Sequence, residues 1–251
     1  QNFVESDETG FIPYSRQNVN EVDINRVCEV LQSDFLTQGP AVPAFEKAVA
    51  NKVGALYTVA VNSGTSALHL SCLSLEVGPG DVVWTTPNTF VASANCALYC
   101  GANVDFVDID PETWCLSVKK LEAKLLKHQS QNLPLPKVVI PVHLSGQSCD
   151  MQAIAELGQK FGFRIIEDAS HAVGGRYLAD AVGNCRYSDI TVFSFHAVKI
   201  ITSGEGGMAL TNDKELARRI GMLRTHGITR EVDQLEYESA GPWYYEQHCL
   251  G

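Results

Sequence analysis

Apolar residues along this chain follow two alternating patterns: short continuous runs, and longer stretches with apolar positions three and four residues apart. The longer pattern is typical of an amphipathic helix, and it first appears after Asn20, a residue type that often caps a helix. It predicts helices over 20–32, around 42–49, and over 65–75, 89–99, 117–127, 151–161 and 214–223. The short runs predict strands over 56–61, 82–84, 104–107, 137–142, 164–167, 190–195 and 208–211.

The regular alternation of strand and helix predicts an α/β protein. Its central sheet should be mostly parallel, with helices covering both faces. In such sheets ligands bind beyond the carboxyl ends of the strands. Residues that directly follow a predicted strand are therefore the first candidates for a functional site.

Composition narrows the class of function. The net charge is −10, with 19 basic against 29 acidic residues and no basic run, which argues against a nucleic-acid partner. No apolar run reaches the ~18 residues of a membrane span. The first ten residues are polar and acidic, which is unlike a signal peptide. The eight cysteines include no C-x-x-C pair, so we expect no metal site, reduced thiols and a cytoplasmic protein.

Two clusters after strands carry polar residues suited to a ligand. The first, N-S-G-T-S-A over 62–67, places Gly64 and Thr65 where a helix begins, and a helix N-terminus favours a phosphate. Taken alone, it is equally consistent with a plain helix cap. The second ends a buried strand at Asp168, where a carboxylate needs a partner. A protonated cofactor ring nitrogen is one such partner, and a salt bridge or helix cap is the alternative.

A third cluster contains a lysine after an apolar strand. In F-S-F-H-A-V-K, Ser194 is suited to a phosphate oxygen and Lys199 to a Schiff base, which lysine forms when desolvated. The alternative is a lysine that extends its amine to water. The following G-E-G-G-M-A nominally fits a dinucleotide fingerprint, but its glycines precede a strand, so we interpret it as a turn. Together the clusters supply the binding groups that pyridoxal phosphate (PLP) requires.

Four segments stand in an informative order: N-S-G-T-S-A-L, T-P-N-T-F-V-A-S-A-N, E-D-A-S-H and F-S-F-H-x-x-K-x-x-T-x-G-E-G-G. This order resembles that of the DegT/StrS-type family, which are fold-type-I PLP-dependent aminotransferases acting on nucleotide-linked keto-sugars. The resemblance covers the chain from Phe11 onward. The flanking segments F-L-T-Q-G-P and G-P-W-Y-Y-E look most like the branch that aminates C4 of a UDP-linked 4-keto-6-deoxy-N-acetylhexosamine on the route to pseudaminic acid.

The resemblance implies a role for each matched residue. Lys199 matches the Schiff-base lysine that also moves protons, and Asp168 the carboxylate that keeps the pyridine nitrogen protonated. The other implied cofactor contacts are Gly64, Thr65 and Ser194 at the phosphate, Phe90 on the ring face and His171 at the ring hydroxyl. By its own pattern, Phe90 would be a core aromatic. Thr37 and Gln38 are the implied nucleotide-sugar contacts, and His196 belongs to the motif with its contact, cofactor or substrate, left open.

The implied reaction moves an amino group from glutamate to a UDP-linked 4-keto-6-deoxy sugar. Relatives with histidine in place of the lysine are dehydratases, so Lys199 favours transamination. The resemblance also implies a homodimer with shared active sites. We expect an N-terminal segment and first helix over 1–40 and the large PLP-binding domain over 41–251. Family members continue past this point into a smaller C-terminal domain, which this chain lacks. The alternative is therefore a truncated, non-catalytic fragment that binds PLP or a nucleotide-sugar.

Overall fold

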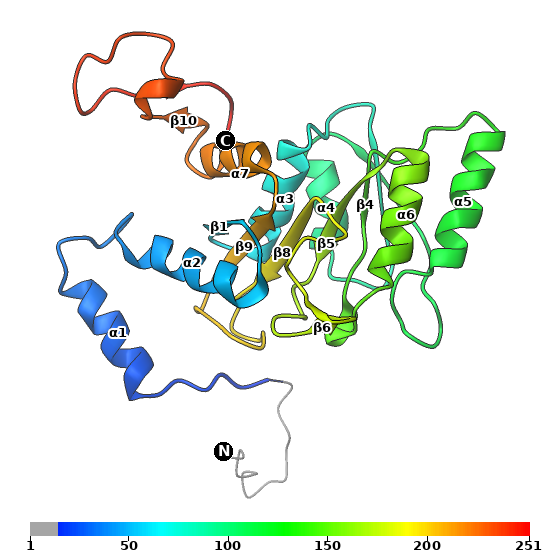
Figure 1. The fold of residues 1–251 in the computed structure, drawn as a ribbon, viewed down its shortest axis with the longest axis horizontal. Coiled ribbons are helices and arrows are strands. Elements are labelled where there is room, and N and C mark those ends of the chain that lie inside the picture. The colour runs from blue at the N-terminus through cyan, green and yellow to red at the C-terminus, as the bar shows by residue number, and fades with distance from the viewer. Residues whose placement is uncertain (1–14) are drawn as a thin grey trace, which may run out of the picture.

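A seven-stranded sheet forms the centre of the computed structural model, which describes residues 15–251 (Figure 1). In spatial order its strands are β1 (Tyr57–Val61), β9 (Gly207–Thr211), β8 (Ile190–Ser194), β5 (Arg164–Asp168), β4 (Val138–Ile140), β2 (Val82–Thr85) and β3 (Asn103–Phe106). Neighbours from β8 to β3 pair in parallel, and β9 alone runs antiparallel to both its neighbours. The predicted, mostly parallel α/β sheet is therefore confirmed.

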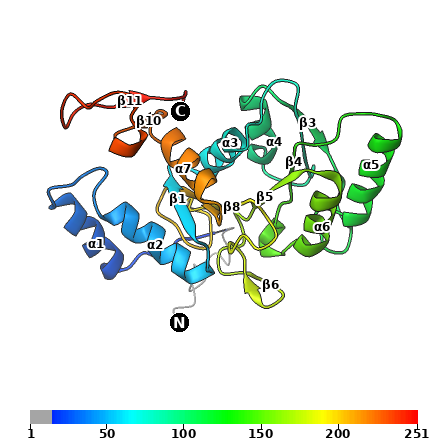
Figure 2. The same ribbon diagram turned by 45° about the horizontal axis from the view of Figure 1, so that its top comes forward.

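Seven helices accompany the sheet in the described part of the chain (Figure 2). They are α1 (Glu21–Leu31), α2 (Ala41–Val53), α3 (Gly64–Ser74), α4 (Ala92–Tyr99), α5 (Val118–Ser130), α6 (Met151–Phe161) and α7 (Lys214–Leu223). Apolar side chains of α3, α4 and α7 share one core cluster with one face of the sheet, and those of α5 and α6 share another with the opposite face. Helices cover both faces, as the alternating pattern predicts.

Two short antiparallel pairs and two 3-10 turns complete the fold. The pairs join β6 (Arg176–Tyr177) to β7 (Asp180–Ala181), and β10 (Ile228–Thr229) to β11 (Glu246–Gln247). The 3-10 turns span Leu144–Gly146 and Val232–Gln234.

Side-chain alternation along β5 decides which chemistry faces which helices. Ile165 packs in the cluster of α5 and α6, and Ile166 in the cluster of α3, α4 and α7. Because successive strand residues point to opposite faces, Glu167 follows Ile165 and Asp168 follows Ile166. The two adjacent carboxylates therefore lie on opposite faces of the sheet.

The predicted elements all exist, and the differences lie at their ends. The helix predicted over 89–99 begins only at Ala92, since residues 86–91 form a loop in which Asn88 donates to the Thr86 hydroxyl. The strand predicted over 137–142 is Val138–Ile140 and stops before Pro141, which lacks a backbone N–H. The predicted Asn20 cap is present, with its side chain accepting from Val22.

The first helix has an apolar face that nothing in the described chain covers. No residue of α1 is buried, and Val22, Val27 and Leu31 are all exposed. The expected N-terminal segment over 1–40 lies partly outside the described residues, which begin at 15. The division at residue 40 stays a prediction. None of the helices from residue 15 onward has the length and apolar character needed to cross a bilayer.

Gly207, the first residue of β9, passes directly over the peptide between Ser63 and Gly64. A Cβ at this position would lie 2.2 Å from the Ser63 carbonyl oxygen and 2.5 Å from the Gly64 nitrogen. Both obstacles are backbone, so neither can rotate away.

We expect Gly207→Ala to destabilise the protein by about 1–3 kcal/mol, because the added methyl group forces two backbone segments apart. Chemical denaturation would measure the change. Gly221→Ala is the matched control, since this helical glycine has no atom within 4 Å of an added Cβ. It should be neutral or stabilise by up to about 1 kcal/mol. Equal effects of the two substitutions would contradict the close approach at Gly207.

Candidate active site

A cavity of about 620 Å³ lies at the carboxyl ends of β5 and β8, on the face that carries α3 and α4. Eight of the ten candidate site residues from the sequence line it: Gly64, Thr65, Phe90, Asp168, His171, Ser194, His196 and Lys199. They come from four segments that are far apart in the chain. Thr37 and Gln38 do not line this cavity.

Asp168 is the buried charged group of the cavity, with 5% of its surface exposed. One carboxylate oxygen accepts a 2.6 Å hydrogen bond from the hydroxyl of Ser93, and the other accepts from the backbone N–H of Ser170 at 3.2 Å. Both donors are neutral groups, and the carboxylate itself lines the cavity. The alternative prediction of a salt bridge or helix cap is wrong: within residues 15–251 Asp168 makes neither.

The hydroxyl of Ser93 is itself held in place. Ser93 is fully buried on α4, and its oxygen lies 2.8 Å from that of Thr89. Because Ser93 donates to Asp168, it accepts from Thr89, which also lines the cavity. A charge-assisted hydrogen bond of this kind contributes about 1.5–3 kcal/mol.

Lys199 lies on a loop that leaves the end of β8 and returns to the start of β9. The loop is closed at its base by Phe195, whose N–H donates to Gly206 and whose carbonyl accepts from Ser203. Within this loop the chain makes a turn from His196 to Lys199, in which the backbone N–H of Lys199 donates to the carbonyl of His196 at 2.9 Å. Burial lowers the pKa of Lys199, and the charge of Asp168 opposes that shift without cancelling it.

The start of α3 and the end of β8 meet at one corner of the cavity. Ser63 caps α3 by accepting from Ser66, which leaves the N–H groups of Gly64 and Thr65 without intrahelical acceptors. A Cβ on Gly64 would lie 3.0 Å from that of Ser194. Glycine thus lets the helix N-terminus approach the Ser194 hydroxyl, and the two form a cradle of donors suited to an anion such as phosphate.

Phe90 and His171 stand on other walls of the cavity. Phe90 is 68% exposed, so the interpretation of this residue as a core aromatic is wrong. His171 follows Asp168 in a turn, and its Nδ1 accepts from the N–H of Ser145 at 3.2 Å. Burial and the positive charge of Lys199 lower the pKa of His171, against an opposing effect of Asp168.

Thr37 and Gln38 line a second cavity, of about 640 Å³, together with α2, the end of β1 and residues 223–225. Its main charged pair is Arg224 with Glu46, 2.7 Å apart. His196 stands half exposed at the first cavity, 3.9 Å from Glu205. In the described part of the chain, no group of three or more His, Cys, Asp or Glu side chains is arranged to hold a metal ion.

Sequence reasoning missed several residues that support the cavity. Ser93 and Thr89 stand in the same T-P-N-T-F-V-A-S motif as Phe90, and Ser93 follows Phe90 at helical spacing. That spacing was a usable signal for a side chain on the cavity side. The sequence contains no comparable signal for Ser145 or for the Glu167–His143 pair, because their roles depend on contacts between separate strands and loops.

Comparison with known proteins finds a matching family and several similar relatives. Residues 17–244 match the model of the DegT/DnrJ/EryC1/StrS aminotransferase family. The chain is 44% identical over 241 residues to the spore coat polysaccharide biosynthesis protein SpsC of Bacillus subtilis, covering 96% of this chain and 59% of that protein. It is 40% identical over 220 residues to the UDP-4-amino-4,6-dideoxy-N-acetyl-beta-L-altrosamine transaminase of Campylobacter jejuni, covering 88% and 56%.

Solved structures show the same fold. Helicobacter pylori PseC, an aminotransferase involved in the biosynthesis of pseudoaminic acid, superposes with a TM-score of 0.83 at 31% identity, covering 95% of this chain and 60% of that one. Spr1654 of Streptococcus pneumoniae, solved in a PLP-form, superposes with a TM-score of 0.81 at 30% identity, covering 95% and 61%. This chain therefore spans about three fifths of the length of these proteins.

Removing the charge of Asp168 should lower the pKa of Lys199 further, because the one influence that raises it is lost. Asp168→Asn keeps the shape of the side chain, and the pH dependence of Lys199 acetylation, followed by mass spectrometry, reports the change. Glu112→Gln, at an exposed carboxylate that does not line the cavity, is the control. An unchanged or higher Lys199 pKa in Asp168→Asn would disprove the electrostatic coupling.

Proposed function

The chain belongs to the DegT/DnrJ/EryC1/StrS aminotransferase family, and we propose that it binds PLP in the Lys199 cavity and moves an amino group from glutamate to a UDP-linked 4-keto-6-deoxy sugar. One observation carries the proposal. The amine of Lys199, the carboxylate of Asp168 and an anion cradle at the start of α3 all line one cavity.

The groups of the cavity fit this cofactor. The N-terminus of α3 at Gly64 and Thr65, with Ser194, would hold the phosphate, since Gly64 leaves the space that a Cβ would fill. Asp168, held by two donors, would face the ring nitrogen. Exposed Phe90 offers a ring face for stacking. When bound, PLP supplies a reactive aldehyde and a ring that withdraws electrons from the bonds being broken.

Lys199 would act as the base of the reaction. A base works best when its pKa is near the working pH, and burial moves the Lys199 amine in that direction. With the amine uncharged, Nζ can take a proton from the α-carbon of the amino donor and return one to the acceptor carbon. The Asp168 carboxylate would be held in place by the hydrogen bonds from Ser93 and Ser170.

His171 would supply a fixed donor. Its Nδ1 accepts from Ser145, so a neutral ring carries its proton on Nε2. The lowered pKa of His171 favours that neutral form. His171 would thus donate from Nε2 to the hydroxyl side of the cofactor ring, without adding a positive charge beside Lys199.

The substrate class rests on the relatives. The C. jejuni transaminase is named for a UDP-linked sugar with an amino group at C4 and no oxygen at C6. Amination of a 4-keto-6-deoxy precursor produces that pattern. We assign the sugar nucleotide to the side of the cavity near His196, with Thr37 and Gln38 as further contacts. Glutamate as donor and a homodimer with shared sites follow from the family resemblance.

PLP added to the purified protein should produce a visible absorbance band that requires Lys199. The band should be absent in Lys199→Ala and present in Lys160→Ala, a control at an exposed lysine that pairs with Glu122. A titration of both variants and the parent chain against PLP measures this directly. If Lys199→Ala retains the band, another amine binds the aldehyde and the assignment of Lys199 is wrong.

Glutamate together with the UDP-linked 4-keto-6-deoxy sugar should yield 2-oxoglutarate and a 4-amino sugar in equal amounts. Lys199→Ala should slow this transfer by about 10²–10⁴-fold, the usual contribution of a positioned base. Mass spectrometry of the sugar nucleotide and an assay of 2-oxoglutarate give both yields. A Lys199-dependent band with no 2-oxoglutarate would instead support the alternative of a chain that binds PLP without turnover.

A further inference from the structure

We propose that His143 and Glu167, here called the brace, position Asp168 and His171 from the face of the sheet opposite the cavity. Neither brace residue lines the cavity or takes part in the reaction outlined above. Both are almost fully buried, with exposed fractions of 0% and 5%. The inference rests on the proposed function only for the roles of Asp168 and His171.

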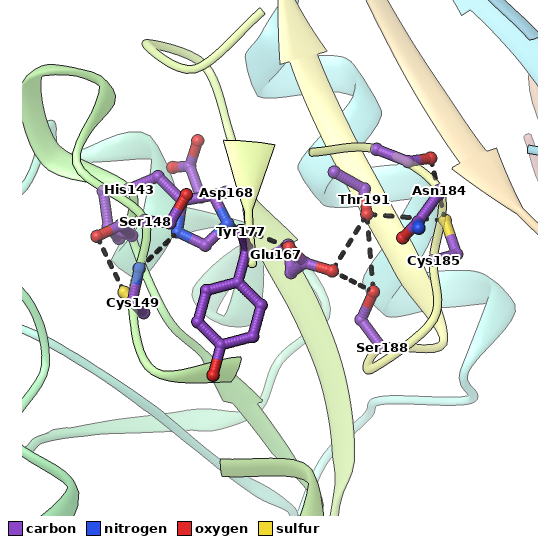
Figure 3. A network of polar contacts seen from close by, with 12 residues as sticks. His143, Ser148, Cys149, Glu167, Asp168, Tyr177, Asn184, Cys185, Ser188 and Thr191 are labelled. Atoms are coloured by element: carbon purple, nitrogen blue, oxygen red, sulfur yellow. Dashed lines mark hydrogen bonds and ion pairs between the residues drawn. The ribbon is translucent and has the colours of Figure 1, made fainter. Parts of the chain in front are cut away.

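Glu167 is a buried carboxylate with every oxygen occupied (Figure 3). One oxygen accepts from Nε2 of His143 at 2.8 Å, and the other accepts from the hydroxyls of Ser188 and Thr191. Figure 3 shows the side chain extending away from Asp168, toward these two hydroxyls. Burial alone would raise the pKa of Glu167, but the contact with His143, followed by the hydroxyls of Ser188 and Thr191, brings it below the usual value.

The protonation of His143 follows from its two neighbours. Its Nδ1 accepts from the backbone N–H of Cys149 at 3.1 Å, and a backbone N–H can only donate. Nδ1 therefore carries no proton, and the single proton of the ring lies on Nε2, directed at Glu167. The other titratable groups nearby, Cys115 and Cys149, are on the loops packed against the ring. The neutral Nε2–H tautomer satisfies both contacts at once.

The brace reaches Asp168 through the backbone. The N–H of His143 donates to the carbonyl of Asp168 at 3.0 Å, and the N–H of Asp168 donates to Pro141 at 2.9 Å. A parallel bridge between Val142 and Asp168 continues the pairing of β4 with β5 beyond the strands. The side chain of His143 bonds that of Glu167, the residue that precedes Asp168. The peptide that carries the Asp168 carboxylate is thus held on both sides.

The brace reaches His171 through the turn that follows His143. Ser145 has a left-handed backbone, with φ of 54°, and this conformation directs its N–H at Nδ1 of His171. Gly146 continues the turn with φ of 87°, and a Cβ there would lie 3.1 Å from the carbonyl of His171. The same short segment therefore sets the position of both cavity residues.

A structural role alone does not explain a charged pair in this place. A buried ion or hydrogen-bonded pair can often be replaced by apolar residues of similar size without loss of stability. Apolar residues cannot make directional hydrogen bonds. The ring of His143 donates to Glu167 and accepts from Cys149, and these two bonds fix the orientation of the ring and of the segment that bears it. This difference allows positioning to be measured separately from stability.

The experiment uses the full chain with ¹⁵N-labelled histidine and follows the imidazole nitrogens by NMR between about pH 5.5 and 8.5. In the parent chain, neutral His143 should carry its proton on Nε2, and so should neutral His171. In the double variant His143→Leu/Glu167→Leu, the unfolding midpoint should be retained. His171 should then become a mixture of tautomers, and the PLP dissociation constant should rise about tenfold, as when outer supports of metal sites are removed.

Two controls separate the outcomes. His128→Gln, at a histidine that bonds Pro134 and does not line the cavity, should leave both the His171 signal and PLP affinity unchanged. A double variant with an unaltered His171 tautomer and PLP affinity overturns the brace. A neutral His143 ring that carries its proton on Nδ1 overturns it without any variant. Absence of PLP binding by the parent chain would overturn the proposed function instead, and the histidine signals would still decide the brace.

Discussion

The burial of one carboxylate, that of Asp168, constrains the rest of the site. An ionised group removed from water costs several kcal/mol unless hydrogen bonds replace its hydration. Here a hydroxyl from α4 and a backbone N–H from the turn after β5 provide that replacement. The carboxylate lines the same cavity as Lys199. The start of α4 and the turn after β5 must therefore both adopt their observed positions for the carboxylate to keep its two donors.

The reversed strand β9 explains how distant segments meet at the cavity. The loop between β8 and β9 returns to Phe195, where it began, and so places Lys199 close to the end of β8. β9 then inserts between β8 and β1. Its first residue, Gly207, passes over the peptide that starts α3. A sheet of wholly parallel strands would have needed a crossover helix between β8 and its next neighbour, which would separate the lysine from the cradle.

The fold class and the cavity residues with obvious chemistry were accessible from the sequence. The strand periods placed Asp168 and Ser194 at strand ends, and the cluster around Gly64 indicated the start of a helix suited to a phosphate. Phe90 was misread by its pattern alone, because periodicity does not distinguish a core aromatic from one that lines a cavity. Ser93, Ser145 and the brace were not predicted. Their partners are 75, 26 and 24 residues away in the sequence, and a hydrogen bond of that range leaves no local pattern.

Because Glu167 and Asp168 are adjacent in β5, the register of this strand decides which carboxylate enters the cavity. A shift of β5 by one residue would interchange the two side chains, since their directions alternate along the strand. The longer glutamate would enter the cavity, and the aspartate would face His143 with one carbon fewer. An insertion or deletion within β5 would thus exchange the acid of the cavity while leaving the composition of the strand almost unchanged.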